Sequence, residues 1–554
     1  MKGSFSRLLL ASVITGVLVG LAVAAFELLT VDILLEEVLE RPLWQQALAP
    51  GIGLVLAAGL LRWGASGANP STSDEYIRAF HARAPHLAIR ELPGKLAAGA
   101  ATIGFGGALG LEGPSVYSGS VLGVAVHDRL RRWLSHGDVR LLLTAGAAAG
   151  IAAVFQTPAT GVIFALESPY RDDVARRALL PALLAAAAGY ITFVTVLHPD
   201  SAIPSLGFRP GPIELTDLLG AALLGVAAGL SGRGFARLVK MTKDITGRVA
   251  WWKRLMVAST VMGALVVVSD VLFEEPLSLG PGLNAIEWVI DPDRGLLVIA
   301  ALFAVRMVAT LSSLGGGGSG GLFIPLVVQG TILGRFVGGI LPGDEAISSL
   351  WPTLGLAAFL GAGYRVPIAA VMFVAESTSG DSYVVPALIA AAVSQLVAGP
   401  SSVAIGQRTA RIGHLESRLQ LPIATALSTD ELTVPPDATL AEFMELHVLG
   451  RRRRTVPVVD GDSYLGLCTL ADLGDVERAD WEVTTVADVM RRDTPVGRPD
   501  WTLHDAVAAM ENDRLDLLAV VDANGWFVGV VDADEIVRLD EILDEAEWRR
   551  EPGG

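Results

Sequence analysis

Long apolar stretches dominate the chain from about Leu8 to Ala404, whereas the sequence beyond Arg408 reads as a soluble α/β segment. Roughly eleven of these stretches are long enough, or nearly so, to enter a bilayer. The first follows Lys2 and Arg7 and is too long for the apolar core of a signal peptide. It is therefore predicted to be a transmembrane helix with a cytoplasmic N-terminus. The pattern predicts an α-helical polytopic membrane domain followed by a soluble domain.

Composition supports a membrane protein and narrows its partners. Hydrophobic residues make up 52% of the chain and charged residues only 18%, with a mean hydropathy of +0.51. The formal net charge of −16 argues against a nucleic-acid partner. Cys468 is the single cysteine, so an intrachain disulfide is excluded. The absence of a His/Cys cluster at ligand spacing argues against a structural metal site.

The glycine-rich stretch from Gly104 to Ser120 places one carboxylate, Glu112, where a helix should begin. Pro114 suits the first turn of that helix, and the glycines before it allow other groups to approach the backbone closely. The start of a helix binds anions, because it presents unpaired N–H groups and a partial positive charge. Glu112 could thus act as a tethered anion that occupies such a site or leaves it. The alternative is an ordinary acidic helix cap.

Two motifs recur along the membrane region at nearly the same offset. The sequence G-L-E-G-P at 110–114 returns as G-L-F-I-P at 321–325, and F-Q-T-P-A-T-G-V-I-F-A-L-E-S at 155–168 aligns with Y-R-V-P-I-A-A-V-M-F-V-A-E-S at 364–377. The membrane region is therefore predicted to be a duplicated unit, about 14–200 and 212–405. Duplicated halves with helices broken by glycine and proline at matching positions are typical of transporters, whose binding site lies near the midplane. Because that site would consist largely of helix N-termini, its ligand should be an anion.

These motifs resemble those of the CLC family of chloride channels and proton-coupled chloride transporters, over essentially the whole chain. The resemblance implies an inverted-repeat membrane fold, a homodimer, and a gating role for Glu112. It also implies that the backbone amides of Leu322 and Phe323, in G-G-L-F-I-P, coordinate the central anion. Lys95 and Gly113 fit the family pattern as well.

The sequence departs from the family pattern at four places. Near residues 65–70 either Ser66 or Gly67 stands where the family has an anion-coordinating serine, and Ala404 occupies the place of the anion-binding tyrosine. Leu111 replaces the basic residue before the glutamate, and Ser168 replaces the internal glutamate of proton-coupled members. We therefore expect the central site to bind anions chiefly through backbone amides, and proton coupling to be weak or absent.

A substitute proton relay is available beside position 168. Glu167 could take over the relay, although its repeat-related match, Glu376, suggests that both residues cap matching helix ends.

The soluble tail resembles a pair of CBS modules. In the first, Thr469 and Asp472 would hold the ribose of an adenine nucleotide; Asp532 and Glu535 take the same places in the second. A CBS pair that serves as a dimer contact without a ligand is the alternative. The predicted organisation is a membrane domain at 1–415, a linker at 416–423, CBS modules at 424–478 and 482–541, and an acidic tail at 542–554.

Two other functions compete with anion transport as explanations of this sequence. The sequence G-A-S-G at 64–67 resembles the nucleophile motif of rhomboid proteases, but that chemistry needs a histidine base inside the membrane, and none of the histidines lies in an apolar span. A CBS-regulated divalent-cation transporter would use intramembrane carboxylates, for which Glu112, Glu167 and Glu376 are the candidates. Glycine-rich helix N-termini suit anions better.

The sequence thus predicts a homodimeric, multi-pass protein of the plasma membrane with cytoplasmic CBS domains, and not an enzyme. We expect this protein to pass chloride or a similar small anion through a pathway gated by Glu112 in each subunit. The main hypothesis is a channel or a weakly proton-coupled transporter, and the alternative is a fully coupled chloride/proton antiporter. No cofactor is required, and adenine nucleotide is the expected ligand of the tail.

Overall fold

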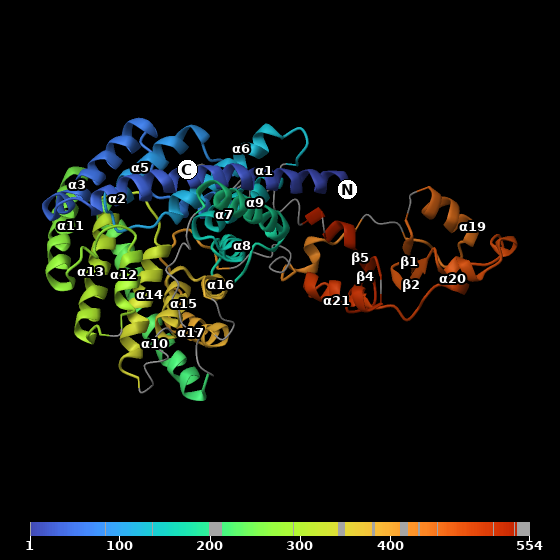
Figure 1. The fold of residues 1–554 in the computed structure, drawn as a ribbon. Coiled ribbons are helices and arrows are strands. Elements are labelled where there is room, and N and C mark those ends of the chain that lie inside the picture. The colour runs from blue at the N-terminus through green and yellow to red at the C-terminus, as the bar shows by residue number, and fades with distance from the viewer. Residues whose placement is uncertain are drawn as a thin grey trace. The chain divides into compact units, whose positions relative to one another are not determined.

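The chain divides into two compact units, Met1–Arg411 and Ile412–Gly554 (Figure 1). The predicted acidic tail at 542–554 and the start of the predicted linker, 416–418, lie outside the described residues. The computed structural model describes residues 2–82, 85–135, 137–198, 213–291, 293–341, 350–378, 383–409, 419–429, 433–450, 453–513, 515–536 and 538–539.

The first unit is helical, as its apolar pattern predicted. Seven of its helices are long and apolar enough to cross a membrane, and four shorter apolar helices accompany them within the described residues. The helices are α1 (Lys2–Glu27), α2 (Glu36–Leu39), α3 (Leu43–Gly59), α4 (Ser73–His81), α5 (Leu92–Gly104), α6 (Glu112–Arg129), α7 (Asp138–Phe155), α8 (Pro158–Glu167), α9 (Leu179–Leu197), α10 (Leu215–Thr246), α11 (Trp251–Phe273), α12 (Leu283–Val289), α13 (Leu296–Gly315), α14 (Phe323–Gly338), α15 (Leu350–Tyr364), α16 (Pro367–Ser377) and α17 (Val384–Ala398).

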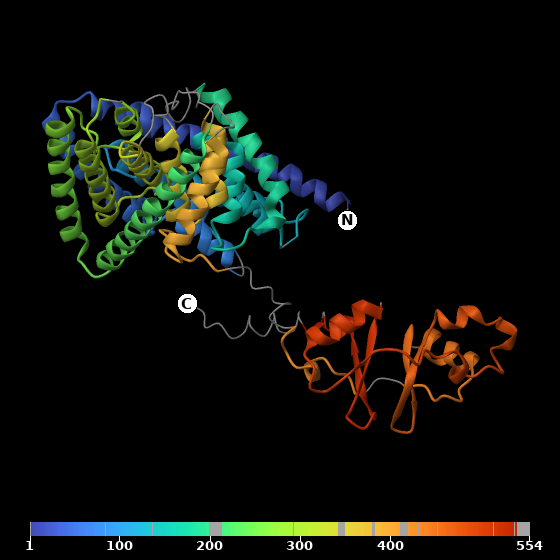
Figure 2. The same ribbon diagram turned by 90° about the horizontal axis from the view of Figure 1, so that it is seen from below.

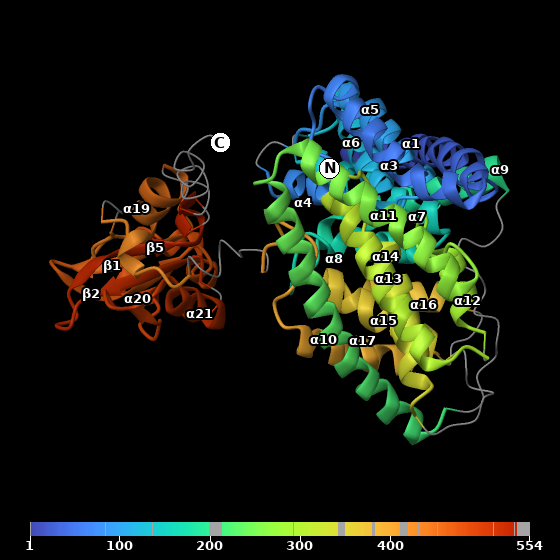
Figure 3. The same cartoon turned by 90° about the vertical axis from the view of Figure 1, so that its left-hand side faces the viewer.

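Two helices form the centre of this unit. From Leu142 to Phe155 every residue of α7 is buried, and so is all of α15 except Trp351. The outer helices instead expose large apolar side chains, such as Leu10, Trp44 and Leu297, as expected for surfaces that face lipid. Figure 3 shows α10 as one long helix, which packs along α15 and α17.

The duplication read from the sequence is visible in the helix order. Helices α6 to α9 correspond to α14 to α17, and both α8 and α16 begin at the proline of their shared motif. The residue that follows the aromatic end of the preceding helix is left-handed in both halves, Gln156 at φ 57° and Arg365 at φ 59°.

Glycines bring α6 into backbone contact with α7, and α14 into backbone contact with α15. A Cβ atom on Gly119 would lie 2.0 Å from the carbonyl oxygen of Gly146, and one on Gly330 would lie 2.4 Å from that of Gly355. Small residues at crossings of this kind allow closely packed membrane helices.

Two further contacts between the halves repeat this symmetry. Gly110 and Gly321, the matching glycines of the two motifs, exchange backbone hydrogen bonds of 2.9 and 2.8 Å. The carboxylate of Glu376 accepts from the N–H groups of Ala159 and Thr160 at the start of α8, at 2.9 and 2.7 Å. Reciprocally, Glu167 accepts from two N–H groups at the start of α16, at 3.2 and 2.8 Å. The expectation that these two glutamates cap matching helix ends is confirmed.

A buried arginine fixes the loop before α12. The guanidinium of Arg306, on α13, donates to the carbonyl oxygens of four loop residues over distances of 2.6 to 3.3 Å: Leu277, Leu279, Gly280 and Pro281. A Cβ atom on Gly282 would lie 2.4 Å from Nη2 of Arg306, so only glycine fits there. The N–H of Gly280 in turn donates to the carbonyl of Gly106 at 3.0 Å. Arg306 therefore supports the glycine loop that leads to Glu112.

The second unit contains two small sheets (Figure 2). Strands β1 and β2 pair antiparallel, whereas β4 pairs parallel with β3 and antiparallel with β5. Leu467 of the first sheet packs with Leu517, Ala519 and Val530 of the second in one buried cluster. The elements are α19 (Leu440–Glu442), β1 (Thr455–Asp460), β2 (Ser463–Thr469), α20 (Val486–Val489), β3 (Val496–Gly497), α21 (Leu503–Asp513), β4 (Leu517–Val521) and β5 (Phe527–Asp532).

Arg306→Met should lower the stability of the first unit strongly. Methionine fills part of the space but donates no hydrogen bonds, and each carbonyl left unpaired costs roughly 1–3 kcal/mol. We expect a clear drop in the Tm of the protein purified in detergent. The exposed Arg62 provides the matched control, Arg62→Met, with little change expected. An unchanged Tm for Arg306→Met would show that the loop holds its conformation without the guanidinium.

Glu167→Gln and Glu376→Gln should destabilise the protein to a similar extent, about 1 kcal/mol each, because an amide presents one oxygen to two N–H donors and carries no charge for the helix dipole. Thermal unfolding in detergent measures both, with the exposed Glu36→Gln as control. A Glu167→Gln protein with normal Tm that moves no protons would identify Glu167 as a relay and not a cap.

Candidate functional site

The carboxylate of Glu112 sits between the starts of two helices. Glu112 is the first residue of α6 and is fully buried. Its Oε1 accepts a hydrogen bond of 2.5 Å from the backbone N–H of Phe323, the first residue of α14, and the N–H of Ile324 also faces the carboxylate. The other oxygen, Oε2, has no partner within the described residues. The carboxylate therefore occupies an anion site made by helix N-termini.

The paired glycines leave room for this carboxylate. A Cβ atom on Gly110 would lie 1.9 Å from Oε2 of Glu112, and one on Gly321 would lie 2.0 Å from Oε1. A Cβ on Gly113 would meet the N–H of Gly321 at 2.7 Å. Any other residue at these positions would displace the carboxylate or separate the two helix starts.

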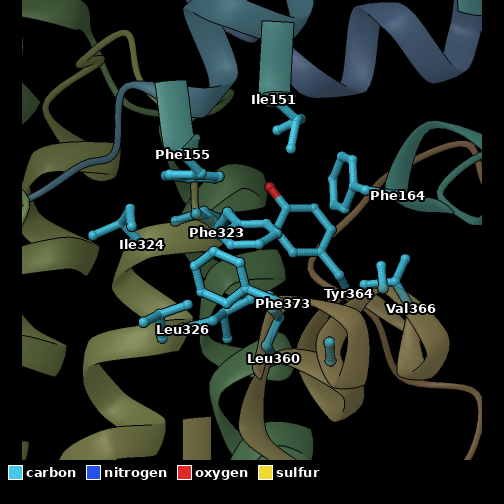
Figure 4. Close-up of a cluster of buried hydrophobic side chains, with 14 of the residues drawn as sticks. Ile151, Phe155, Phe164, Phe323, Ile324, Leu326, Leu360, Tyr364, Val366 and Phe373 are labelled. Carbon is cyan, nitrogen blue, oxygen red and sulfur yellow. The ribbon is translucent and has the colours of Figure 1, made fainter. Parts of the chain in front are cut away.

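Phe323 is held in place by a cluster of aromatic rings (Figure 4). Its ring stacks on Phe155 with centroids 4.7 Å apart and meets Phe164 and Phe373 edge to face at 5.5 and 5.1 Å. These partners come from α7, α8 and α16. The direction of the Phe323 N–H is therefore fixed by packing from both halves.

A cavity of about 610 Å³ opens beside this pair of helix starts. Three of its lining residues are cationic and one is acidic. Asp74, the acidic one, accepts from Lys243 at 2.7 Å and from the backbone N–H of Ile405 at 2.9 Å. The excess of positive charge favours anions. The lining residues are Gly67, Ala68, Asn69, Pro70, Ser71, Thr72, Ser73, Asp74, Arg78, Lys243, Thr246, Gly247, Arg254, Leu314, Gly317, Gly318, Gly320, Gly321, Leu322, Tyr364, Val403 and Ile405.

The structure separates the residues that the sequence offered for the central anion site. Leu322 and Gly67 line the cavity, but Ser66 is exposed and does not. Ala404 is buried between two lining residues, and its own N–H is bonded to Ser402 Oγ at 3.2 Å. Gly113, the second residue of α6, lies against the N–H of Gly321.

Sequence reasoning missed the hydroxyl groups of this cavity. Thr72 and Ser73 lie at the start of α4, where Thr72 Oγ1 donates to the carbonyl of Gly320 at 3.3 Å. Tyr364 ends α15 and adds a phenolic hydroxyl. The hydroxyl-rich run S-T-S at 71–73 was a usable signal, whereas nothing around Tyr364 marked it.

Lys95 is buried beside α4. It is 1% exposed and pairs with Glu75 of α4 at 2.6 Å. Its ammonium also lies 4.4 Å from the ring centroid of Tyr117 on α6. The ion pair with Glu75 and the contact with the Tyr117 ring together hold α4 and α6 against each other beside the cavity.

At the position of the internal relay the structure offers no titratable side chain. Ser168 is 1% exposed, and its Oγ has no hydrogen-bond partner within the described residues. Gln407 donates from Nε2 to the carbonyl of Ser168 at 3.0 Å, and its Oε1 is buried and unpaired among those residues too. Glu167, next to Ser168, has both oxygens occupied as a helix cap.

The expected nucleotide-site residues in the second unit differ in their engagement. Asp472 Oδ2 accepts from both the N–H and the hydroxyl of Thr469 at 2.7 Å. Asp532 pairs with Arg453 at 2.6 Å, and Glu535 forms a long contact of 3.5 Å with Arg538.

Burial and the Asp472 charge raise the pKa of the Cys468 thiol to about 12, so this cysteine stays protonated and unreactive at neutral pH.

Across the residues that the structure describes, no group of His, Cys, Asp and Glu side chains is arranged to hold a metal ion.

Comparison with known families matches both units. A family model described as voltage gated chloride channel matches residues 52–399. A model for the CBS domain matches residues 423–476 and 486–541.

Curated relatives carry exchange transporter names. The chain is 29% identical over 326 residues to a protein of Vibrio parahaemolyticus named H(+)/Cl(-) exchange transporter ClcA, covering 56% of this chain and 68% of that one. It is also 29% identical over 311 residues to the protein of the same name in Vibrio cholerae, covering 54% and 64%. The chain thus spans about two thirds of the length of these relatives.

Solved structures share the fold. A slow cyanobacterial Cl−/H+ antiporter matches with a TM-score of 0.62 at 24% identity, over 71% of this chain and 94% of that chain. A eukaryotic CLC transporter matches with a TM-score of 0.58 at 17% identity, over 97% and 99%. With a family model over more than half of its length and two CBS domains behind it, this chain belongs to the CLC family of anion transport proteins.

Proposed function

We propose that the protein exchanges chloride or a similar small anion for protons across a membrane, with Glu112 as the gate. The carrying observation is the Glu112 carboxylate on the N–H of Phe323, a tethered anion in a site built for a free one. The names of the relatives favour coupled exchange. The channel or weakly coupled transporter that the sequence favoured is the less well supported hypothesis, and the fully coupled alternative becomes the proposal.

The gate works by competition for the same donors. An ionised Glu112 holds the N–H groups at the start of α14, so a mobile anion is excluded. A proton on the carboxylate removes its charge, and the neutral side chain then loses its advantage at the helix dipole. The anion takes the vacated donors, and deprotonation reverses the exchange. Anion and proton therefore alternate at one place.

The proton needs a route that does not use a carboxylate at position 168. Ser168 Oγ and Gln407 Oε1 are both buried and unpaired within the described residues, and such oxygens are the partners that buried water requires. Water held by these two groups carries the proton toward Glu112 in this proposal. Glu167 remains a helix cap.

The assembly and the tail complete the proposal. The protein acts as a homodimer in the plasma membrane, with an anion pathway in each subunit and the N-terminus and CBS domains in the cytoplasm. The tail regulates transport, and adenine nucleotide binds at Asp472, whose carboxylate Thr469 already orients. No cofactor takes part in transport itself, and no chemical reaction is catalysed.

Glu112→Gln should keep anion flux and abolish both its pH dependence and proton movement, because glutamine cannot alternate between charged and neutral forms. Purified protein in sealed liposomes under opposed chloride and proton gradients gives the reversal potential. Wild-type protein should move protons uphill when driven by chloride, and the variant should pass chloride alone. The surface substitution Glu36→Gln should behave as wild type. A Glu112→Gln protein with the wild-type pH profile would make Glu112 an ordinary cap.

Adenine nucleotide should bind the full-length protein, and Asp472→Ala should reduce that binding by about tenfold or more, because a carboxylate that holds hydroxyl groups is lost. Equilibrium dialysis with ATP, ADP and AMP measures it, and the exposed Asp500→Ala serves as control. Absence of binding at millimolar nucleotide would leave the tail as a dimer contact only.

A further inference from the structure

With Ala404 in the place of the family's anion-binding tyrosine, the sequence left the central anion site without a phenol, and Tyr364 brings one to the cavity. Tyr364 is buried at the end of α15 and lines the cavity beside Glu112. Its hydroxyl faces the side chain of Ser73 and the backbone N–H of Leu322. Leu322 precedes Phe323, whose N–H holds the Glu112 carboxylate. The phenol therefore faces the neighbour of the residue that binds Glu112, on the side of the cavity.

The Ser73 side chain is a second and independent sign of a ligand at this place. Ser73 begins α4, is 9% exposed and lines the same cavity. Its Oγ makes no well-formed hydrogen bond within the described residues. The Tyr364 hydroxyl faces it, and two buried hydroxyls placed in this way keep hydrogen-bonding capacity for a further partner. The N–H of Leu322 is directed at the oxygen of Tyr364, and the hydroxyl hydrogens of Tyr364 and Ser73 are the donors that can serve an anion.

The position of the Tyr364 ring is fixed by the fold. The ring meets Phe164 edge to face at 5.5 Å, and Figure 4 shows its hydroxyl directed away from its own backbone. The carbonyl of Tyr364 accepts from Gln407 Nε2 at 3.1 Å. The next residue, Arg365, is left-handed and bonds to Asp172 at 2.7 Å. A phenol held this firmly loses little side-chain entropy when it binds an anion.

The duplication supplies an internal comparison. Tyr364 and Phe155 hold equivalent places at the ends of α15 and α7, before the left-handed residues Arg365 and Gln156. Both rings pack in the aromatic cluster around Phe323, but only the ring of the second half carries a hydroxyl. The cluster accounts for an aromatic residue at position 364 but not for its hydroxyl, which meets polar groups at the cavity instead.

We propose that Tyr364 is the hydroxyl ligand of the transported anion, acting with Ser73 at a site next to Glu112, where the N–H of Leu322 orients the phenol oxygen. It takes the role of the family's anion-binding tyrosine, whose place in this chain is held by Ala404, and it comes from the end of α15. The inference rests on the proposed anion transport and names a ligand and selectivity residue for it. The central site then consists of side-chain hydroxyls as well as backbone amides, contrary to the sequence-based expectation.

The test compares chloride binding and selectivity in three full-length proteins. Tyr364→Phe keeps the ring and removes the donor, so it should weaken chloride binding by about tenfold and reduce the preference for chloride over nitrate. Tyr76→Phe is the matched control. The Tyr76 hydroxyl is buried but donates to the carbonyl of Ala165 at 2.6 Å, outside the cavity. Calorimetry gives the affinities, and liposome flux gives the chloride-to-nitrate ratio.

The outcomes separate the two proposals. Wild-type protein that binds no chloride and passes none would overturn the proposed function. Wild-type binding that Tyr364→Phe leaves unchanged, or that Tyr76→Phe weakens equally, would overturn the role of Tyr364. If Tyr364→Phe does not fold, a fluorinated tyrosine at position 364 replaces it, and its more acidic hydroxyl should tighten chloride binding. Unchanged affinity with that residue would also refute the role.

Discussion

The reciprocal backbone pairing of Gly110 with Gly321 is the contact on which the anion site depends. It fixes the starts of α6 and α14 against each other, so the N–H groups of one helix face the side chain of the other. Only glycine leaves space there for the Glu112 carboxylate. The supports of this pairing are buried polar groups, among them Arg306, which holds the loop bonded to Gly106. The proposed gate, which exchanges its carboxylate for a mobile anion, needs such a rigid frame, because donors that moved with the carboxylate would not become free for chloride.

Duplication gives the membrane unit a common set of parts, which the two halves then use differently. The helix caps Glu167 and Glu376 remain equivalent, each holding the start of the other half's helix. At the motif glycines the halves diverge: one carries Glu112 as a tethered anion, and the other presents the N–H of Phe323 that receives it. Phe155 and Tyr364 diverge likewise, one as a packing ring and the other with a hydroxyl in the cavity. Some positions of the repeat thus keep the same stabilising role in both halves, whereas others take a different role in each half.

Around Ser168 the fold is kept without a carboxylate, and the proposed proton route has to use other groups. Ser168 and Gln407 leave two buried oxygens unpaired within the described residues, while the neighbouring Glu167 is fully engaged with α16. Both oxygens of Glu167 already accept from the start of α16, so in the proposed exchange water bound at the two open oxygens, and not Glu167, carries the proton.

The sequence by itself determined the fold class, the duplication and the helix start at Glu112. It also determined that Glu167 and Glu376 are equivalent helix caps in the two halves. These rest on hydropathy, on glycine and proline positions and on repeated motifs, all of which are local properties of the chain. Only the tertiary structure decided which residues with hydroxyl groups line the cavity beside Glu112, and it placed Thr72, Ser73 and Tyr364 there while leaving Ser66 exposed. The physical reason is that a ligand can come from any helix whose end reaches the site. A motif fixes the backbone donors at one helix start, but the side chains that complete the shell are chosen by packing between segments far apart in sequence.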